Sequence, residues 1–178
     1  FSVPLHISHV TRFMQGRTEL LVLGALGATQ AAGIYNISMR VSFLGAMLIN
    51  AFIAIASPMI TNLHRQGDIS QLDAVFKVIT KWLIIVNVPL SLWIMVLAEP
   101  LLQIFGREFA AGAAALSILA VARMIDSATG IGGAMINMVG RSEVSAFNAF
   151  LSVIFSLVFA LVLIPPFGLV GAAVAALL

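Results

Sequence analysis

The segment "SILAVARMIDSATG" (residues 117–130) decides the fold, because it places Arg123 and Asp126 inside a long apolar run. A charge in the hydrocarbon of a bilayer is costly enough to need a structural reason. The two residues are three positions apart, so on a helix they are neighbours on one face and can neutralise each other. Two interpretations follow. The residues form a structural ion pair, or Arg123 contacts an anionic substrate while Asp126 positions it or titrates as a proton site.

The composition of the whole chain indicates a membrane protein. Hydrophobic residues make up 61% of the 178 positions and charged residues 9%, against roughly 25% charged in an ordinary soluble domain. The mean hydropathy is +1.12, and most of the expected helices are apolar all round rather than along one stripe. These values argue against a soluble domain and favour an all-α, polytopic transmembrane helical bundle.

The two ends of the chain suggest a piece of a larger protein. The first residue is Phe1 rather than methionine, and the last residues, "GAAVAALL" (171–178), form an apolar run much shorter than the roughly 20 residues of a span. We therefore expect residues 1–178 to be a single transmembrane bundle that is a fragment of a longer chain.

Hydrophobic runs and turn residues predict five complete helices and the start of a sixth. The expected ranges are Pro4 to Ala28, Ile34 to Asn62, Leu72 to Leu97, Phe109 to Val139, Val144 to Ile164, and a last segment after Gly168. The connections are short, as in an up-and-down bundle. Pro58 and Pro89 fall inside two of these helices and are expected to kink them.

The basic residues predict the orientation in the membrane. Arg65, Lys77, Lys81 and Arg141 lie in or near two loops on one side of the bundle, and Arg107 lies on the other side. Because cytoplasmic loops carry an excess of lysine and arginine, the first group is expected in the cytoplasm.

The first predicted helix carries a polar stripe. Its members recur at spacings of four, three and four, which places them on one helix face; they are Ser8, Arg12, Gln15 and Glu19. Such a stripe is expected to face a water-filled cavity or polar helices rather than lipid. The alternative is that the helix begins near Gly16, so that Arg12 and Arg17 are cytoplasmic anchors.

Arg40 stands about six residues from the outer end of the second helix, roughly 9 Å deep at 1.5 Å per residue. Its long side chain can snorkel to the headgroups. An inward-facing cationic role is the equally favoured alternative.

The sequence offers no signature of an enzyme or a metal site. His6 and His9 are three apart, but no third ligand type clusters with them. There is no cysteine, and no nucleophile stands at a recognisable spacing from a base. The nine basic residues form no block of the kind that binds nucleic acid. We expect no catalytic residue, no cofactor, no metal and no nucleic-acid partner.

Several phrases together resemble one family. They are "RTELLVLGALGATQAAGIYNISMRVSFL" (17–44), "SPMITNLHRQGD" (57–68), "LLQIFGREFAAGAAALSILAV" (101–121), "MINMVGRSEVSAFNAF" (135–150) and "LIPPFGLVGAA" (163–173). In this order they are similar to the C-terminal half of polysaccharide flippases, the lipid-linked oligosaccharide exporters of the multidrug/oligosaccharidyl-lipid/polysaccharide exporter superfamily.

The resemblance implies a second, C-terminal lobe of a two-lobed exporter whose N-terminal lobe is missing here. It also implies flipping of undecaprenyl-pyrophosphate-linked oligosaccharide, such as an O-antigen or exopolysaccharide unit, across the bacterial cytoplasmic membrane by alternating access. The substrate would meet charged residues of the cavity; the candidates in this sequence are Arg12, Arg17, Glu19, Arg40, Arg123 and Asp126. A polysaccharide polymerase and glycosyltransferases are the partners that it suggests, besides membrane lipid.

Two other functions stay open. A drug antiporter of the same superfamily would use Glu19 or Asp126 to bind H⁺ or Na⁺, although four candidate arginines against two carboxylates favour an anionic substrate. A non-transporting membrane scaffold would have little use for the hydrated face expected on the first helix.

Overall fold

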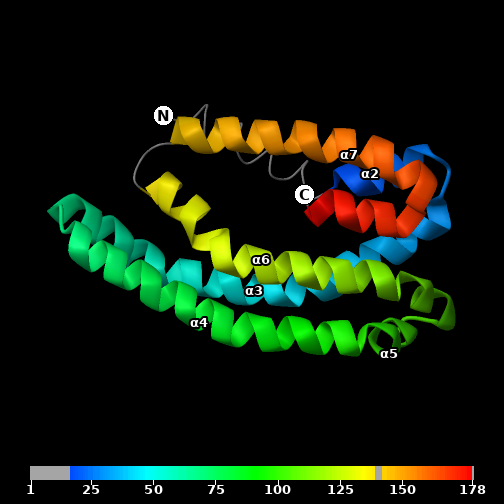
Figure 1. Ribbon diagram of the computed structural model, residues 1–178, viewed down its shortest axis with the longest axis horizontal. Coiled ribbons are helices and arrows are strands. Elements are labelled where there is room, and N and C mark those ends of the chain that lie inside the picture. The colour runs from blue at the N-terminus through cyan, green and yellow to red at the C-terminus, as the bar shows by residue number, and fades with distance from the viewer. Residues whose placement is uncertain (1–16, 139–141, 178) are drawn as a thin grey trace.

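The chain folds as a bundle of helices, and the computed structural model describes residues 17–138 and 142–177 (Figure 1). The helices are α2 (Thr18–Ala25), α3 (Thr29–Gln66), α4 (Ile69–Val96), α5 (Ala98–Gln103), the 3-10 helix η1 (Arg107–Gly112), α6 (Ala113–Met138) and α7 (Ser142–Leu177). Within these two ranges no residue is in a strand. The prediction of an all-α fold is confirmed.

Four described segments are long and apolar enough to cross a membrane. They are Thr29–Gln66, Ile69–Val96, Arg107–Thr129 and Phe147–Leu177. Side chains on their outer surfaces are largely apolar, and residues such as Trp93 and Val96 are 69% and 80% exposed. An apolar surface of this kind fits lipid rather than water, so the polytopic membrane architecture expected from composition is confirmed.

The predicted helix boundaries need several corrections. The second predicted helix was placed at 34–62, but α3 begins at Thr29 and runs to Gln66. Gly33, interpreted as part of a turn, lies inside α3, where a Cβ would meet nothing within 4 Å. The segment between α4 and α6, expected as a loop, contains α5 and η1. Of the first predicted helix, 4–28, only the part from residue 17 onward lies within the described residues.

The turn between α3 and α4 is built by two residues. Gly67 adopts φ 72°, a left-handed conformation that costs glycine no steric penalty and ends the helix. Asp68 then caps α4, because its Oδ1 accepts a hydrogen bond from the backbone N–H of Gln71 at 3.0 Å. The long helices α3 and α4 therefore return alongside each other as a tight hairpin.

The helices pack in two groups. Helices α3, α4 and α6 lie side by side, and α2 with the two arms of α7 packs beside them (Figure 1). The second group closes over the start of α3, where Tyr35 is fully buried and its hydroxyl donates to the backbone oxygen of Ala172 at 3.2 Å. Tyr35 and Ala172 thus join the beginning and the end of the described chain.

Helix α7 contains a reversal. Gly168 has φ 55° and ψ −124°, which are not helical values, and Pro165 and Pro166 precede it. In Figure 1 the chain runs along the orange arm, turns, and comes back as the red arm. A Cβ added to Gly171 would overlap the carbonyl oxygen of Leu163, so glycine is needed for the two arms to approach. The expected break between 144–164 and the segment after Gly168 is confirmed, with Gly168 itself at the break.

The ends of the elements agree with an up-and-down order. The α3–α4 hairpin, the end of α6 and the start of α7 lie toward one end of the bundle (Figure 1). Helix α5, η1 and the reversal in α7 lie toward the other end. Pro58 and Pro89 lie within the continuous helices α3 and α4.

Candidate functional site

The charged residues on α6 form an ion pair. The Nη1 atom of Arg123 lies 2.6 Å from Oδ2 of Asp126, one turn further along the helix. The Arg123 side chain is 28% exposed and the Asp126 side chain 48%. The pairing expected from their spacing is present. Because both side chains are partly exposed, a molecule outside the described bundle can contact them.

Arg123 also marks the point where three helices meet. The side-chain amide of Asn87, on α4, donates to the backbone oxygen of Arg123 at 2.9 Å, and Asn87 is fully buried. From α3, Gly45 faces both residues: an added Cβ would lie 2.8 Å from Oδ1 of Asn87 and 3.5 Å from Cβ of Arg123. We call Gly45, Asn87, Arg123 and Asp126 the polar cluster.

The polar cluster lies inside candidate membrane spans, away from the helix ends. Asn87 is ten residues before Leu97, the C-cap of α4, which corresponds to about 15 Å along the helix. The cluster therefore lies several turns from the end of the span. Polar residues at this depth are expensive and typically mark a functional path.

Hydrogen-bonding capacity in this region is not fully used. Among the described residues, Oδ1 of Asn87, Nε of Arg123 and Oγ of Ser91 are buried and have no hydrogen-bond partner. A buried polar group without a partner costs about 1–3 kcal/mol. The polar cluster and the neighbouring Ser91 thus carry three buried polar atoms whose hydrogen-bonding capacity is unused among the described residues.

Asn87 and Gly45 were missed by the sequence analysis. Their signal was present: Asn87 is a lone amide in the apolar run "LIIVNVPLSL" (83–92), two positions before Pro89. A single polar residue of this kind inside a span points to an interhelical contact. Gly45 carried no signal of its own, because its role depends on the position of α4.

Glu19 forms a second buried contact. Its side chain is 2% exposed, and Oε1 accepts a hydrogen bond from Oγ of Ser156 at 2.9 Å. Helix α2 thereby joins the long arm of α7. In the structure this carboxyl group contacts a serine of the apolar helix α7, and the prediction that the whole stripe faces a cavity or polar helices stays a prediction. Ser8, Arg12 and Gln15 of the same predicted stripe lie outside the described residues.

Two other candidate arginines, Arg17 and Arg40, are not members of the polar cluster. Arg17 is exposed at the start of α2. Arg40 is exposed on α3, and its Nε donates to Oδ1 of Asn36 at 3.2 Å. The structure therefore brings Arg123 and Asp126 together with Asn87, and it brings Glu19 to Ser156. Among the described residues, the hydrogen bond of the Arg40 side chain is to Asn36 on the same helix.

No group of three or more histidine, cysteine, aspartate or glutamate side chains within 17–138 and 142–177 is arranged to hold a metal ion. His6 and His9 lie outside these ranges.

Comparison with known proteins finds similarity to polysaccharide biosynthesis and membrane proteins. A family model described as "Polysaccharide biosynthesis protein" matches residues 1–111. A protein of Haloferax volcanii named "Probable low-salt glycan biosynthesis flippase Agl15" is 25% identical over 171 residues, covering 95% of this chain and 36% of that protein. An uncharacterized membrane protein of Methanocaldococcus jannaschii is 25% identical over 171 residues, covering 90% of this chain and 34% of its own length.

The chain therefore spans about a third of the length of these curated relatives. No solved structure matches it.

Proposed function

Because this chain belongs to the polysaccharide biosynthesis protein family, whose model covers residues 1–111, we propose that it is part of a flippase for a lipid-linked oligosaccharide. The chain is a multi-pass membrane protein. In this proposal it forms one lobe of a larger transporter that works by alternating access, and it carries out no catalysis. The relative named as a glycan biosynthesis flippase supports the proposal.

The observation that carries the proposal is the position of Arg123. Its guanidinium group lies on a candidate membrane span, is partly exposed and keeps a buried Nε without a partner among the described residues. Guanidinium groups bind phosphate through charge-assisted, often paired hydrogen bonds. An isoprenoid pyrophosphate offers this chemistry, and its glycan must cross roughly 30 Å of hydrocarbon.

Asp126 gives the site a means of release. When no substrate is present, its carboxylate neutralises Arg123 at 2.6 Å. A pyrophosphate that approaches from the exposed side competes for the same guanidinium, and the carboxylate regains it when the substrate leaves. Binding of moderate strength of this kind suits a transporter, which must bind its substrate and also release it.

The other candidate residues extend the same proposal. Arg12, Arg17 and Arg40 would supply further positive charge along the path, and Glu19 would fix α2 against α7 beside it. Undecaprenyl as the lipid, a bacterial cytoplasmic membrane, and a polymerase and glycosyltransferases as partners are further parts of the proposal. Both relatives reported above are archaeal, and identification of the transported lipid in the native membrane tests this part of the proposal.

The test is the exchange of Arg123 in the full protein, expressed in a strain that lacks its own copy. Arg123→Ala is expected to abolish surface polymer without lowering the amount of protein in the membrane. Arg107→Ala, which removes an exposed arginine of η1 at one end of the bundle, is the control and should leave the polymer unchanged. Normal polymer with Arg123→Ala would remove Arg123 from the substrate path.

A charge exchange separates a ligand role from a purely structural one. The double variant Arg123→Asp, Asp126→Arg keeps an i, i+3 ion pair but moves the guanidinium by about one turn. If the pair serves only to stabilise α6, the double variant should export polymer, although Arg123→Ala does not. If Arg123 contacts the substrate, export should stay lost although the protein is folded and abundant.

A further inference from the structure

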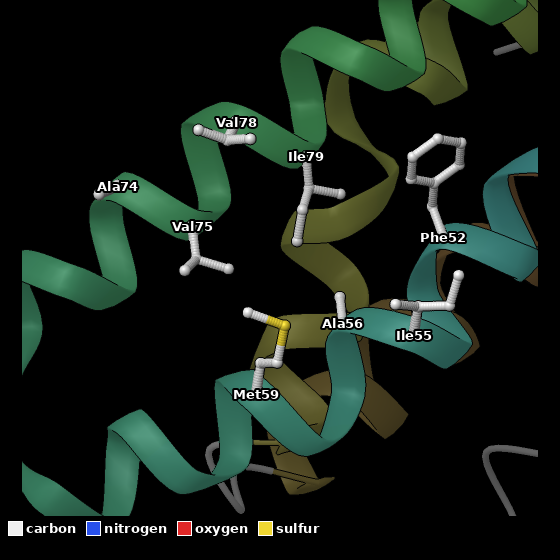
Figure 2. Close-up of a pocket in the computed structure, with 8 residues that line it drawn as sticks. All are labelled: Phe52, Ile55, Ala56, Met59, Ala74, Val75, Val78 and Ile79. Carbon is white, nitrogen blue, oxygen red and sulfur yellow. The ribbon is translucent and has the colours of Figure 1, made fainter.

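Near their hairpin, α3 and α4 meet through apolar side chains. In Figure 2 Met59 on α3 and Val75 on α4 point toward each other, and all eight residues that line the groove between the helices are apolar. Apolar contacts of this kind are non-directional. Asn87, further along α4, is different, because an asparagine side chain can hydrogen-bond across helices and fix their relative position. Its bond goes to the backbone of α6 at Arg123, the residue that carries the guanidinium group.

Asn87 also has a buried acceptor that is not used within the described residues. Its amide nitrogen Nδ2 donates to the backbone oxygen of Arg123 at 2.9 Å. Since only the nitrogen of an amide can donate to a carbonyl oxygen, the remaining atom is the acceptor Oδ1, which is buried and has no partner in the described part of the chain. A buried acceptor of this kind costs about 1–3 kcal/mol unless another group satisfies it.

The stem of Arg123 lies next to this acceptor. A Cβ added to Gly45 would lie 2.8 Å from Oδ1 of Asn87, 3.5 Å from Cβ of Arg123 and 3.7 Å from its Cγ. The amide oxygen and the first two stem carbons therefore lie within 4 Å of one point beside α3. Nε of Arg123 is separated from Cγ by Cδ alone, and within the described ranges it is also buried without a partner. A buried donor and a buried acceptor thus occur in one small region.

The guanidinium group has two parts with different surroundings. Nε is buried, whereas the Arg123 side chain as a whole is 28% exposed and Nη1 lies 2.6 Å from Oδ2 of Asp126. The exposed part therefore consists of atoms other than Nε. Arginine carries five N–H donors in a planar fork, and its terminal nitrogens can hold a phosphate through paired hydrogen bonds.

We propose that Asn87 is a positioning residue for Arg123, an inference that rests on the proposed function for the identity of the ligand. Nδ2 of Asn87 fixes the backbone of α6, and Oδ1 accepts the Nε–H of Arg123 when the guanidinium turns from Asp126 to an anionic ligand. With Nε–H held inward, Nη1 and Nη2 are presented together and bind one phosphate of an isoprenoid pyrophosphate.

Ligand binding in two backgrounds tests this role. The full protein is purified in detergent, and the Kd for farnesyl pyrophosphate is measured with and without Asn87→Leu, which keeps a similar shape but removes both hydrogen bonds. In the parent, Asn87→Leu should raise the Kd about tenfold, the equivalent of about 1.4 kcal/mol. In an Arg123→Lys background it should change the Kd by less than about twofold, because lysine binds phosphate as a point charge and has no Nε–H.

The lysine background separates positioning from a purely structural effect. The bond from Asn87 to the backbone oxygen of residue 123 is kept there, so a structural role predicts the same loss of affinity in both backgrounds, and that result would overturn the inference. An unchanged Kd for Asn87→Leu in the parent would also overturn it. Thr80→Val, which removes another buried hydrogen-bonding group of α4, is the control and should leave the Kd unchanged.

Two further variants complete the test. If Asn87→Leu does not fold, Gly45→Ala replaces it, because the added Cβ displaces Oδ1; it should weaken binding in the parent and not in Arg123→Lys, with Gly33→Ala as its control. Arg123→Ala shows which proposal has failed. Parent-like binding with Arg123→Ala would contradict the proposed function itself, whereas lost binding together with equal Asn87→Leu effects in both backgrounds would contradict the positioning role alone.

Discussion

Replacement of Gly45 by alanine is expected to destabilise the protein through Asn87, on a different helix. The added Cβ would lie 2.8 Å from Oδ1 of Asn87, closer than a carbon and an oxygen can approach without movement. Its next contact, 3.5 Å to Cβ of Arg123, is ordinary packing. The amide of Asn87 must therefore shift, and its 2.9 Å hydrogen bond to the backbone oxygen of Arg123 weakens.

The magnitude follows from these two effects. Overpacking of a well-filled site costs about 1–3 kcal/mol, and a weakened hydrogen bond costs about 0.5–1.5 kcal/mol. We expect Gly45→Ala to lower the free energy of unfolding by about 2 kcal/mol in the parent protein. In an Asn87→Ala background the oxygen is gone, so the same change should cost close to nothing. Independent sites would add to within about 0.5 kcal/mol.

The assay is reversible unfolding in mixed micelles with increasing SDS, followed by tryptophan fluorescence. Gly33→Ala is the matched control, because Gly33 lies in the same helix and a Cβ there would meet nothing within 4 Å. If Gly45→Ala behaves like Gly33→Ala, or costs the same with and without Asn87, the contact between α3 and α4 does not limit stability and the reasoning fails.

Three further predictions concern other contacts. Gly171→Ala should strongly destabilise the reversal in α7, because its Cβ would overlap the Leu163 carbonyl oxygen; an unchanged melting temperature would contradict this. The hydrogen bonds that cap α4 hold the pKa of Asp68 below its usual value, so the stabilisation it gives is present above the ordinary aspartate pKa and disappears as the pH falls through the lower folded value. The melting-temperature difference between parent and Asp68→Ala should shrink over that window. Ser156→Ala should cost more stability in SDS titration than Glu19→Gln, because only the first leaves a buried carboxyl group without its hydroxyl partner; equal losses would refute this.

Local signals predicted the elements well where they act along the chain. The turn "HRQGD" (64–68) contains both the glycine that ends α3 and the aspartate that caps α4. The segment "PPFG" (165–168) placed the reversal at Gly168. One local signal was misleading, and the cause was packing. Gly33 looked like part of a turn, but α3 continues through it because its apolar neighbours Ile34 and Tyr35 are buried against other helices.

The site was only half predictable for the same reason. The pair Arg123 and Asp126 is local, since its spacing alone puts the groups on one helix face. Asn87 contacts Arg123 across 36 positions of the chain, and the importance of Gly45 exists only after α3, α4 and α6 have met. The partner of Glu19 could not be inferred, because Ser156 is one of several serines in apolar segments and nothing near it in the sequence refers to α2.

The two hydrogen bonds that connect α2 and α3 to α7 have a consequence for biosynthesis. Glu19 with Ser156, and Tyr35 with Ala172, each join positions that are 137 residues apart. At about 5–20 residues per second, a ribosome needs roughly 7 to 30 seconds to supply the second partner after the first has emerged. During that interval the carboxyl group of Glu19 and the hydroxyl of Tyr35 have to be accommodated elsewhere, in the insertion machinery or at the membrane surface. A chain that is released before α7 is complete would keep both groups without these partners.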